Sequence, residues 1–283
     1  HAFVEEKKEN ITAALQWLLT YADTNGDGFI DYRFHEDRTM GGSKTQGWMD
    51  STESVFFEDD EMPTYPLAPV EVQAYAFVAM RAWGDALFGI DASLTQVLQE
   101  RAYKLKEKFN STFVIRHGSG VSLAYALDGQ GRLLKSPRSS MGHVLWAVYL
   151  GGEEPESILD GAYIPGVVKR LMSPDLFVSQ AGIRTLSSRS TKYDPLSYHN
   201  GSIWPHDTSM LAEGLENFGY LSEAAKVRKA ALLAYSHFQT PIELFGYTGG
   251  KFKEITTSSG FKACRVQAWS AASLLSTLRT HKT

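Results

Sequence analysis

Cysteine is almost absent from this sequence, and several other features that would narrow its interpretation are missing as well. The single cysteine, Cys264, excludes a disulfide within the chain and leaves the redox compartment open. No apolar run reaches the roughly 20 residues that a membrane-spanning helix needs. Neither sign of charge dominates, because 28 Lys and Arg stand against 32 Asp and Glu, for a net charge of −4. This balance disfavours a nucleic-acid-binding role.

Sequence motifs of several enzyme classes are also absent. The chain has no G-x-S-x-G nucleophile elbow and no glycine-rich loop after a strand that could hold a phosphate. It has no Pro/Ser-rich linker, low-complexity tract or block of like charge, so we expect residues 1–283 to form a single domain. The chain begins with His1 and shows no leader pattern, so its N-terminus indicates no localisation.

Hydrophobic periodicity predicts a mainly helical fold. Pro69 and Gly89 bound the clearest helix, and the alternation in 121–135 around Asp128–Gly129 predicts one hairpin. Strands and helices do not alternate as a parallel sheet requires, so we expect helices in antiparallel pairs with functional loops at one end. The predicted helices span residues 3–22, 69–89, 92–109, 141–150, 155–172, 205–217, 221–238 and 264–280.

Aromatic residues are somewhat abundant, at 12% of the chain with six Trp and thirteen Tyr. One interpretation is a core that uses large side chains. The other is a sugar-binding cleft, where flat rings stack on pyranose faces and keep their polar edges in water. Composition does not decide between them.

The segment "DTNGDGF" resembles the opening of a calcium-binding loop. Asp23, Asn25 and Asp27 precede Gly28 at the spacing of the D-x-[DN]-x-[DN]-G pattern. The twelfth position, which should hold a bidentate Glu, is Phe34, and Glu36 lies two residues later. Two alternatives therefore stay open: a structural calcium ion held with help from elsewhere, or a turn stabilised by Asn and Asp side chains.

The short run "GWMDS" places Trp48 beside Asp50. An isolated Asp in this position is typically a helix cap, here before a helix that starts at Ser51. A tryptophan that excludes water next to a carboxyl favours another role, because burial raises the pKa of a carboxyl group and keeps its proton on.

The segment "YHNGSIWPHD" (198–207) gathers polar and aromatic residues where a helix begins. Pro205 suits the first turn, but the remaining groups exceed what a cap requires, which favours a pocket wall that binds hydroxyls. A zinc site at His199 and His206 is disfavoured because their spacing fits no compact zinc motif. Further along, Glu243 stands among apolar neighbours, where its charge needs a partner.

These stretches occur in an order that resembles a known enzyme family. "QGWMDS", "PVEVQAYAFVAM", "YHNGSIWPHD", "ELFGY" and "ACRVQAWSAASLL" are similar to the C-terminal catalytic part of bacterial glycogen-debranching-type amylo-α-1,6-glucosidases. The resemblance implies an all-α fold, an (α/α)6 toroid of helical hairpins with a small β-hairpin insertion. Such a barrel has twelve helices in two rings, so the first helices are missing from the eight predicted here. The chain is therefore interpreted as the C-terminal portion of a longer protein.

The resemblance also implies roles for individual residues. Asp50, in the "GW-x-D" loop, corresponds to the general acid and Glu243 to the general base of an inverting, exo-acting α-glucosidase that needs no cofactor. Residues expected to line the glucose subsite are Trp48, Glu71, Gln73, Asn200, Trp204, His206, Asp207 and Gln267.

Alternatives remain open on the sequence alone. One alternative is a related (α/α)6-barrel glycosidase, such as a trehalase or a processing α-glucosidase. Another is a non-catalytic carbohydrate-binding domain, which would need the same pocket. A purely structural use of the aromatics predicts no such pocket. The expected partner is an oligosaccharide or polysaccharide, together with a missing N-terminal segment or chain that completes the ring.

Overall fold

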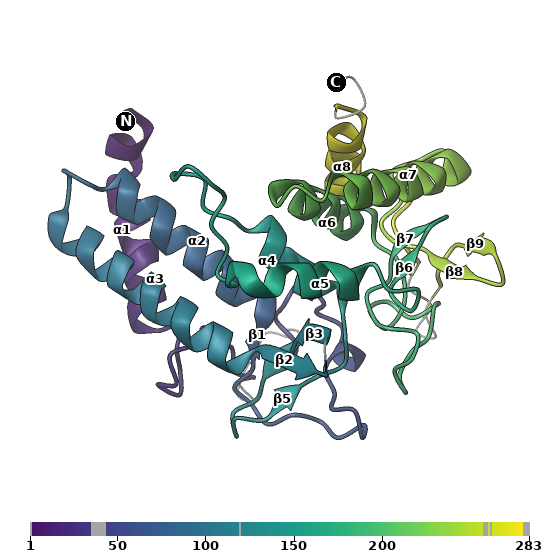
Figure 1. The fold of residues 1–283 in the computed structure, drawn as a ribbon, viewed down its shortest axis with the longest axis horizontal. Helices are drawn as coiled ribbons and strands as arrows, with labels where there is room; N and C mark the ends of the chain where they lie inside the picture. The colour runs from purple at the N-terminus through teal and green to yellow at the C-terminus, as the bar shows by residue number, and fades with distance from the viewer. Residues whose placement is uncertain (1, 35–43, 119, 257–259, 261, 280–283) are drawn as a thin grey trace.

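The computed structural model describes residues 2–34, 44–118, 120–256, 260 and 262–279. Within these residues, eight α-helices form an arc that runs from α1–α3 through α4 and α5 to α6–α8 (Figure 1). No helix in this part of the chain is both long and apolar enough to cross a membrane. The helices are α1 Ala2–Thr20, α2 Val70–Ala86, α3 Ala92–Thr112, α4 His143–Trp146, α5 Ile164–Leu171, α6 Pro205–Asn217, α7 Leu221–Phe238 and α8 Ala268–Arg279.

The strands are short and connect the helices. One antiparallel sheet has the order β1-β4-β5, and three two-stranded hairpins pair β2 with β3, β6 with β7 and β8 with β9. The last four strands lie at the α6–α7 end of the molecule (Figure 1). The strands are β1 Ala68–Pro69, β2 Val114–His117, β3 Gly120–Leu123, β4 Ala126–Leu127, β5 Leu133–Leu134, β6 Phe177–Val178, β7 Gly182–Ile183, β8 Gly246–Thr248 and β9 Lys251–Lys253.

Two helical hairpins, α2–α3 and α6–α7, form where the sequence predicts; α6 and α7 have the predicted bounds, whereas α2 ends at Ala86 instead of 89 and α3 at Thr112 instead of 109. The Asp91 side chain caps α3 by accepting the Leu94 amide at 3.0 Å. Pro205 opens α6, where a missing N–H costs nothing. Gly219 supplies the positive φ of +76° that turns the chain from α6 into α7. Local capping chemistry therefore fixes these four helices.

The main core lies between the helices of the arc. Phe29, Phe109 and Phe113 are fully buried, and their rings approach to 5.0–5.1 Å between centroids. Burial of apolar side chains of this size contributes roughly 1.5–3 kcal/mol each. The packing fixes the loop that follows α1 against α3, which in turn places residues 44–57 beside the centre of the arc.

Two predicted helices are much shorter in the structure. In place of 141–150 the chain forms a 3₁₀ turn over Ser139–Gly142 and then the single turn α4. In place of 155–172 it forms a 3₁₀ turn over Gly161–Tyr163 and then α5. The reason is a competing backbone pairing, because the amide and carbonyl of Glu156 bond to Tyr149 at 2.8–2.9 Å. Helical bonding of the same groups is thereby excluded.

The hairpin expected over 121–135 is divided between two pairings. The turn at Asp128 is present, since its carboxylate accepts the amides of Gln130 and Arg132, and it joins β4 to β5. Residues 121–123 instead belong to β3, which pairs with β2. The sequence pattern located the turn correctly but assigned the first strand to the wrong partner.

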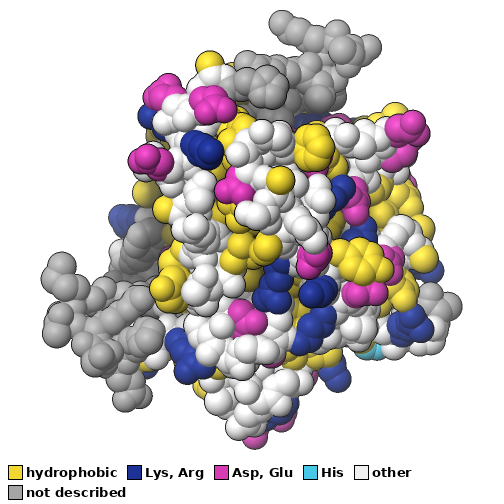
Figure 2. Space-filling view, turned by 90° about the vertical axis from the view of Figure 1, so that its left-hand side faces the viewer, with side chains coloured by type: hydrophobic (Ala, Val, Ile, Leu, Met, Phe, Trp, Pro, Cys, Tyr) yellow, Lys and Arg dark blue, Asp and Glu magenta, His cyan; other side chains and the backbone are white. Residues whose placement is uncertain are grey.

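The face that carries α1–α3 mixes acidic, basic and apolar side chains (Figure 2). Lys and Arg side chains gather in one group near the middle of this view, with Asp and Glu side chains at its edges (Figure 2). The presence of both signs of charge on this face agrees with the balanced composition of the sequence.

Candidate active site

The loop that contains Asp50 is anchored by its neighbours in the sequence. Met49 is fully buried, and the Ser54 hydroxyl donates to the Met49 carbonyl at 2.6 Å. Asp50 itself is exposed to solvent, and the Ser51 side chain does not cap the short 3₁₀ turn Thr52–Ser54. The buried residue on one side of Asp50 and the turn on the other fix the position of an acid that solvent can still reach.

Trp48 lies at the centre of an aromatic cluster. Its indole N–H donates to Ser140 Oγ at 3.0 Å, and its ring stacks on His143 with 5.5 Å between centroids. Its ring also meets Trp204 and His206 edge-on, at 5.8 Å and 5.2 Å. The cluster joins residues that are up to 158 positions apart in the chain (206 − 48), so only tertiary structure assembles it.

Glu243 lies at the edge of this cluster, next to Tyr198, and is almost fully buried. The Tyr198 hydroxyl donates to its Oε1 at 2.6 Å, and the Cys264 amide donates to its Oε2 at 2.7 Å. Hydrogen bonds of this kind stabilise a carboxylate ion in a buried setting. Helix α8 begins at Ala268 instead of the predicted 264, because the segment before it pairs elsewhere: the Cys264 carbonyl accepts the Glu243 amide, and the Gln267 amide donates to the Pro241 carbonyl.

The two carboxyl groups share one electrostatic environment. Partial burial raises the pKa of Asp50, and the negative charge of Glu243 raises it further. The pKa of Tyr198 is raised by burial, by its bond to Glu243 and also by the charge of Asp50. The fold therefore brings Asp50 and Glu243 within range of each other's charge.

Beneath Trp48 lies a buried polar network that connects α2, α4 and α6. His143 Nε2 lies 2.7 Å from Asp207 Oδ1, and its Nδ1 lies 2.6 Å from the Tyr75 hydroxyl. In the neutral imidazole the Asp207 carboxylate accepts the Nε2 proton, so Nδ1 accepts from Tyr75. Among the described residues, Asp207 Oδ2 and His206 Nδ1 are buried and have no hydrogen-bond partner. These atoms can accept or donate to a ligand hydroxyl.

Glu71 is fully buried beside this network. A Cβ at position 47 would lie 3.1 Å from its Oε1, so Gly47 lets the Trp48 loop approach the carboxyl closely. Burial raises the pKa of Glu71 to about 6, and the neighbouring His143 opposes the rise. The protonated form of this carboxyl is therefore favoured in the folded chain up to nearly neutral pH.

Replacing Glu71 by Gln should change how stability depends on pH. Because the pKa of Glu71 is higher in the folded chain than its usual value of 4.5, the folded state is favoured below pH 4.5 and loses this contribution as pH rises through about 6. Glu71→Gln should gain about 2 kcal/mol relative to wild type over that interval. Urea unfolding at pH 4.5 and pH 7 measures this, with the exposed Glu107→Gln as control; an unchanged difference between variant and wild type contradicts it.

A comparison with protein families places this geometry in context. The family model described as "Mannosylglycerate hydrolase MGH1-like glycoside hydrolase domain" matches residues 91–243, which is more than half of the chain. The chain belongs to this family. The match contains Tyr198–Asp207 and ends at Glu243, whereas Trp48, Asp50, Glu71 and Gln267 lie outside it.

Solved structures show that this MGH1-like domain has the fold of (α/α)6 glycosidases. The GH63 mannosylglycerate hydrolase from Thermus thermophilus, in complex with Tris, is similar with a TM-score of 0.52 at 15% identity, over 76% of this chain and 46% of that one. Neutral trehalase Nth1 from Saccharomyces cerevisiae is similar with a TM-score of 0.53 at 16% identity, over 81% and 40%. The chain thus spans less than half the length of each.

A structure titled "Sialidase" matches over a larger part of the chain. It has a TM-score of 0.67 at 13% identity and covers 99% of this chain and 24% of its own. At this level of identity the similarity concerns the fold alone. No curated protein sequence matches the chain.

The MGH1-like fold brings most of the predicted site residues together. Trp48, Trp204, His206 and Asp207 meet in the aromatic and polar cluster, with Glu71 beneath it. Gln267 directly precedes α8 and lies close in sequence to Trp269, whose ring stacks on His206 at 4.2 Å.

Two predicted sugar ligands have their amides occupied by the protein. Gln73 Nε2 donates to the carbonyls of Ile30 and Pro69, and its Oε1 accepts the Ile30 amide. Asn200 Oδ1 accepts from Arg138, and its Nδ2 donates to the Glu53 carbonyl at 2.7 Å. Both side chains fasten loops around the candidate site, and their roles as sugar ligands stay predictions.

Arg138 is a central residue of the site that the sequence analysis missed. Its guanidinium is buried and donates to the carbonyls of Ser54 and His199 as well as to Asn200. Burial lowers the pKa of Arg138 to about 10, so the group stays charged at neutral pH. It joins the Asp50 loop to the 198–207 segment. Its sequence neighbourhood, "SPRSS", gave no signal of this role.

Replacing Arg138 by Met should destabilise the chain by about 3 kcal/mol, because it leaves buried carbonyl groups without donors. Thermal or urea unfolding measures the loss. Arg189→Met is the matched control, since Arg189 is exposed and should change stability by less than about 0.5 kcal/mol. Equal effects of the two substitutions would contradict the role of Arg138 as a loop tie.

The predicted calcium loop forms a tight turn. Asp23 accepts the amides of Asp27 and Gly28 at 2.8–3.0 Å and lies 3.3 Å from Arg101. Glu36 lies outside the described residues. Within the described residues, no group of three or more His, Cys, Asp or Glu side chains is placed to hold a metal ion. Calcium binding by Asp23, Asn25 and Asp27 stays a prediction.

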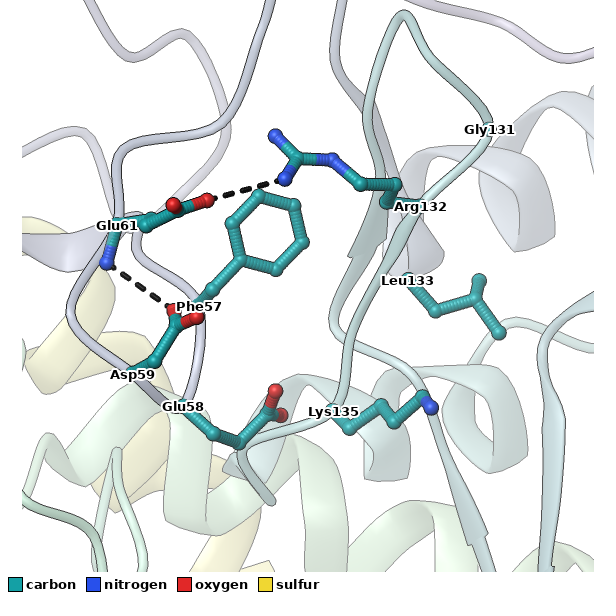
Figure 3. Close-up of a pocket in the computed structure, with 8 residues that line it drawn as sticks. All are labelled: Phe57, Glu58, Asp59, Glu61, Gly131, Arg132, Leu133 and Lys135. Carbon is teal, nitrogen blue, oxygen red and sulfur yellow. Dashed lines mark hydrogen bonds and ion pairs between the residues drawn. The ribbon is translucent and has the colours of Figure 1, made fainter.

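A separate hollow of about 530 Å³ lies between residues 57–61 and the β4–β5 turn (Figure 3). Arg132 crosses it, with its guanidinium 4.2 Å from the Phe57 ring centroid and ion pairs at 3.1 Å to Glu61 and Asp128. None of the predicted site residues lines it. Arg132 and Glu61 are paired within the protein, and we assign the hollow no role.

Proposed function

We propose that the chain carries the catalytic pair of an inverting, exo-acting α-glucosidase of the amylo-α-1,6-glucosidase type. The observation that carries this proposal is a pair of contacts beside the aromatic cluster: Tyr198 donates to Glu243, and its neighbour His199 contacts Ser51, which follows Asp50. Asp50 is the general acid and Glu243 the general base. The flat rings and unpartnered buried polar atoms around Trp48 form the glucose subsite.

The environments of the two acids suit different tasks. Hydrolysis needs a proton on the leaving oxygen and a water at the anomeric carbon, and an inverting enzyme separates the two carboxyls by roughly 6.5–9.5 Å. Asp50 has a raised pKa, which helps it to retain a proton for the leaving group. Glu243 accepts two hydrogen bonds that favour its ionised form, and its remaining lone pairs can orient the attacking water.

The linkage is the least constrained part of this proposal. Relatives by fold include an enzyme named for mannosylglycerate and one named for trehalose, so a trehalase or a processing α-glucosidase is the alternative within the same chemistry. The alternative from another class is a domain that binds carbohydrate without cleaving it.

Hydrolysis and calorimetry on the same samples separate these functions. We expect release of glucose from the non-reducing ends of α-glucosides, with β-glucose appearing first by NMR. Binding by titration calorimetry without any product supports the binding domain instead. Release of α-glucose first contradicts inversion, and turnover restricted to trehalose or to mannosylglycerate reassigns the substrate.

A further inference from the structure

Two adjacent residues, Tyr198 and His199, contact the two halves of the proposed site. The Tyr198 hydroxyl donates to Glu243 Oε1 at 2.6 Å. His199 Nδ1 accepts the Ser51 amide at 3.3 Å and lies 2.9 Å from Ser51 Oγ. Ser51 follows Asp50 directly in the chain. Tyr198, which binds the proposed base Glu243, is therefore joined by one peptide bond to His199, which binds the neighbour of the proposed acid Asp50.

This dipeptide is held rigidly. His199 is fully buried, and its ring stacks on Trp204 with 5.0 Å between centroids and 11° between planes. The Tyr198 carbonyl accepts from Ser202 Oγ at 2.6 Å and from the Trp204 indole at 3.0 Å. Because both rings and the Tyr198 carbonyl are held in place, the dipeptide keeps a fixed distance between the groups that it contacts at its two ends. Packed interiors do not deform continuously.

The protonation of His199 is also defined. The Ser51 amide is always a donor, so Nδ1 is the acceptor and the ring proton lies on Nε2. Burial lowers the pKa of His199 to about 3, and the nearby charges of Arg138 and His206 act in the same direction. His199 is therefore neutral at working pH. The titratable groups that act on Tyr198 are Glu243, Asp50 and Cys264.

We propose that Tyr198 and His199 are positioning residues that together set the separation of the Glu243 and Asp50 carboxyl groups. This inference rests on the proposed function. Its physical basis is that an inverting mechanism needs room for one water and no more between the carboxyls. A shift of about 1 Å in a catalytic group can cost roughly 10²-fold in rate.

The Tyr198 arm is tested with Tyr198→Phe, which removes only the hydroxyl. We expect kcat to fall by about 10- to 100-fold with little change in KM. The loss should be the same on α-glucosyl fluoride, since the attack of water still needs the base. Tyr235→Phe is the control, as its hydroxyl donates to the Ser270 carbonyl elsewhere in the core.

The His199 arm is tested with His199→Ala and His199→Asn. Alanine removes the acceptor for Ser51, so we expect kcat on an unactivated α-glucoside to fall by about 10- to 100-fold. Fluoride leaves without a proton, so most of this loss should disappear on α-glucosyl fluoride. Asparagine can place an oxygen close to the position of Nδ1 and should restore part of the activity on the unactivated substrate.

The outcomes separate this inference from the proposed function. Failure of the wild-type protein to hydrolyse any α-glucoside overturns the proposed function and this inference with it. An active wild type in which Tyr198→Phe behaves like Tyr235→Phe overturns the inference alone. Equal losses of His199→Ala on both substrates, or no recovery with His199→Asn when circular dichroism shows both variants folded, overturn the His199 arm.

Discussion

Asp50→Asn should lower kcat on an unactivated α-glucoside by about 10²- to 10⁴-fold, the usual contribution of a positioned general acid. Asparagine keeps the size and polarity of the side chain but has no proton to give to the leaving oxygen. Asp50 is exposed and its loop is anchored by Met49, so the variant should fold with nearly wild-type stability. The loss should therefore be chemical.

Two measurements identify the missing proton. The variant should recover most of its activity on α-glucosyl fluoride, which needs no acid. The alkaline limb of the kcat/KM profile, which marks deprotonation of the acid, should disappear, because activity falls as pH rises through the pKa of a general acid. Glu58→Gln, an exposed substitution in the same loop, is the control. Near-wild-type turnover by a folded Asp50→Asn protein rules out the acid role.

Glu243→Gln should lower kcat by a similar factor, about 10²- to 10⁴-fold, on activated and unactivated substrates alike. The amide cannot take a proton from the attacking water. The local structure should persist, because the Gln oxygen can accept the Cys264 amide while its NH₂ group donates to the Tyr198 oxygen. Folding and binding of glucose should thus remain measurable.

A smaller variant, Glu243→Ala, tests the same role by chemical rescue. The small Ala side chain leaves space where the attacking water would lie, so azide should enter there and restore turnover. Inversion then requires a β-linked glucosyl azide as the product from an α-linked substrate. Glu254→Gln is the control, since Glu254 is exposed and paired with Arg265. An α-linked azide product is incompatible with an inverting mechanism, and full activity of Glu243→Gln excludes Glu243 as the base.

The candidate site could be predicted in part because its residues occur in compact runs. "GWMDS" and "HNGSIWPHD" each place several pocket residues on one loop, and the structure brings these loops together. Tyr198 stood within such a run but gave no separate signal. Arg138 and His143 could not be predicted, because their roles depend on groups 60 or more residues away, the Ser54 carbonyl and the Asp207 carboxylate.

The secondary structure likewise includes elements that the local sequence predicts and elements that it does not. Helices α2, α3, α6 and α7 have local boundary signals, namely the Asp91 cap, Pro205 in a first turn and positive-φ glycines at 89 and 219. Between α4 and α5 the backbone of Glu156 is paired with Tyr149, and before α8 residues 264 and 267 are paired with Glu243 and Pro241, instead of with a next helical turn. Local propensity is weaker than a hydrogen bond that a distant segment supplies in a buried setting.

By itself the sequence determined the helical class of this chain, the caps of its long helices and the residue types that its site contains. Tertiary structure alone decided which of those residues meet, which amides are already occupied, and that Tyr198 and His199 contact Glu243 and Ser51. The physical reason is the separation along the chain over which each kind of interaction acts. Helix periodicity and capping act over about four residues, whereas burial, charge pairing and ring stacking depend on contacts that exist only after the chain has closed on itself.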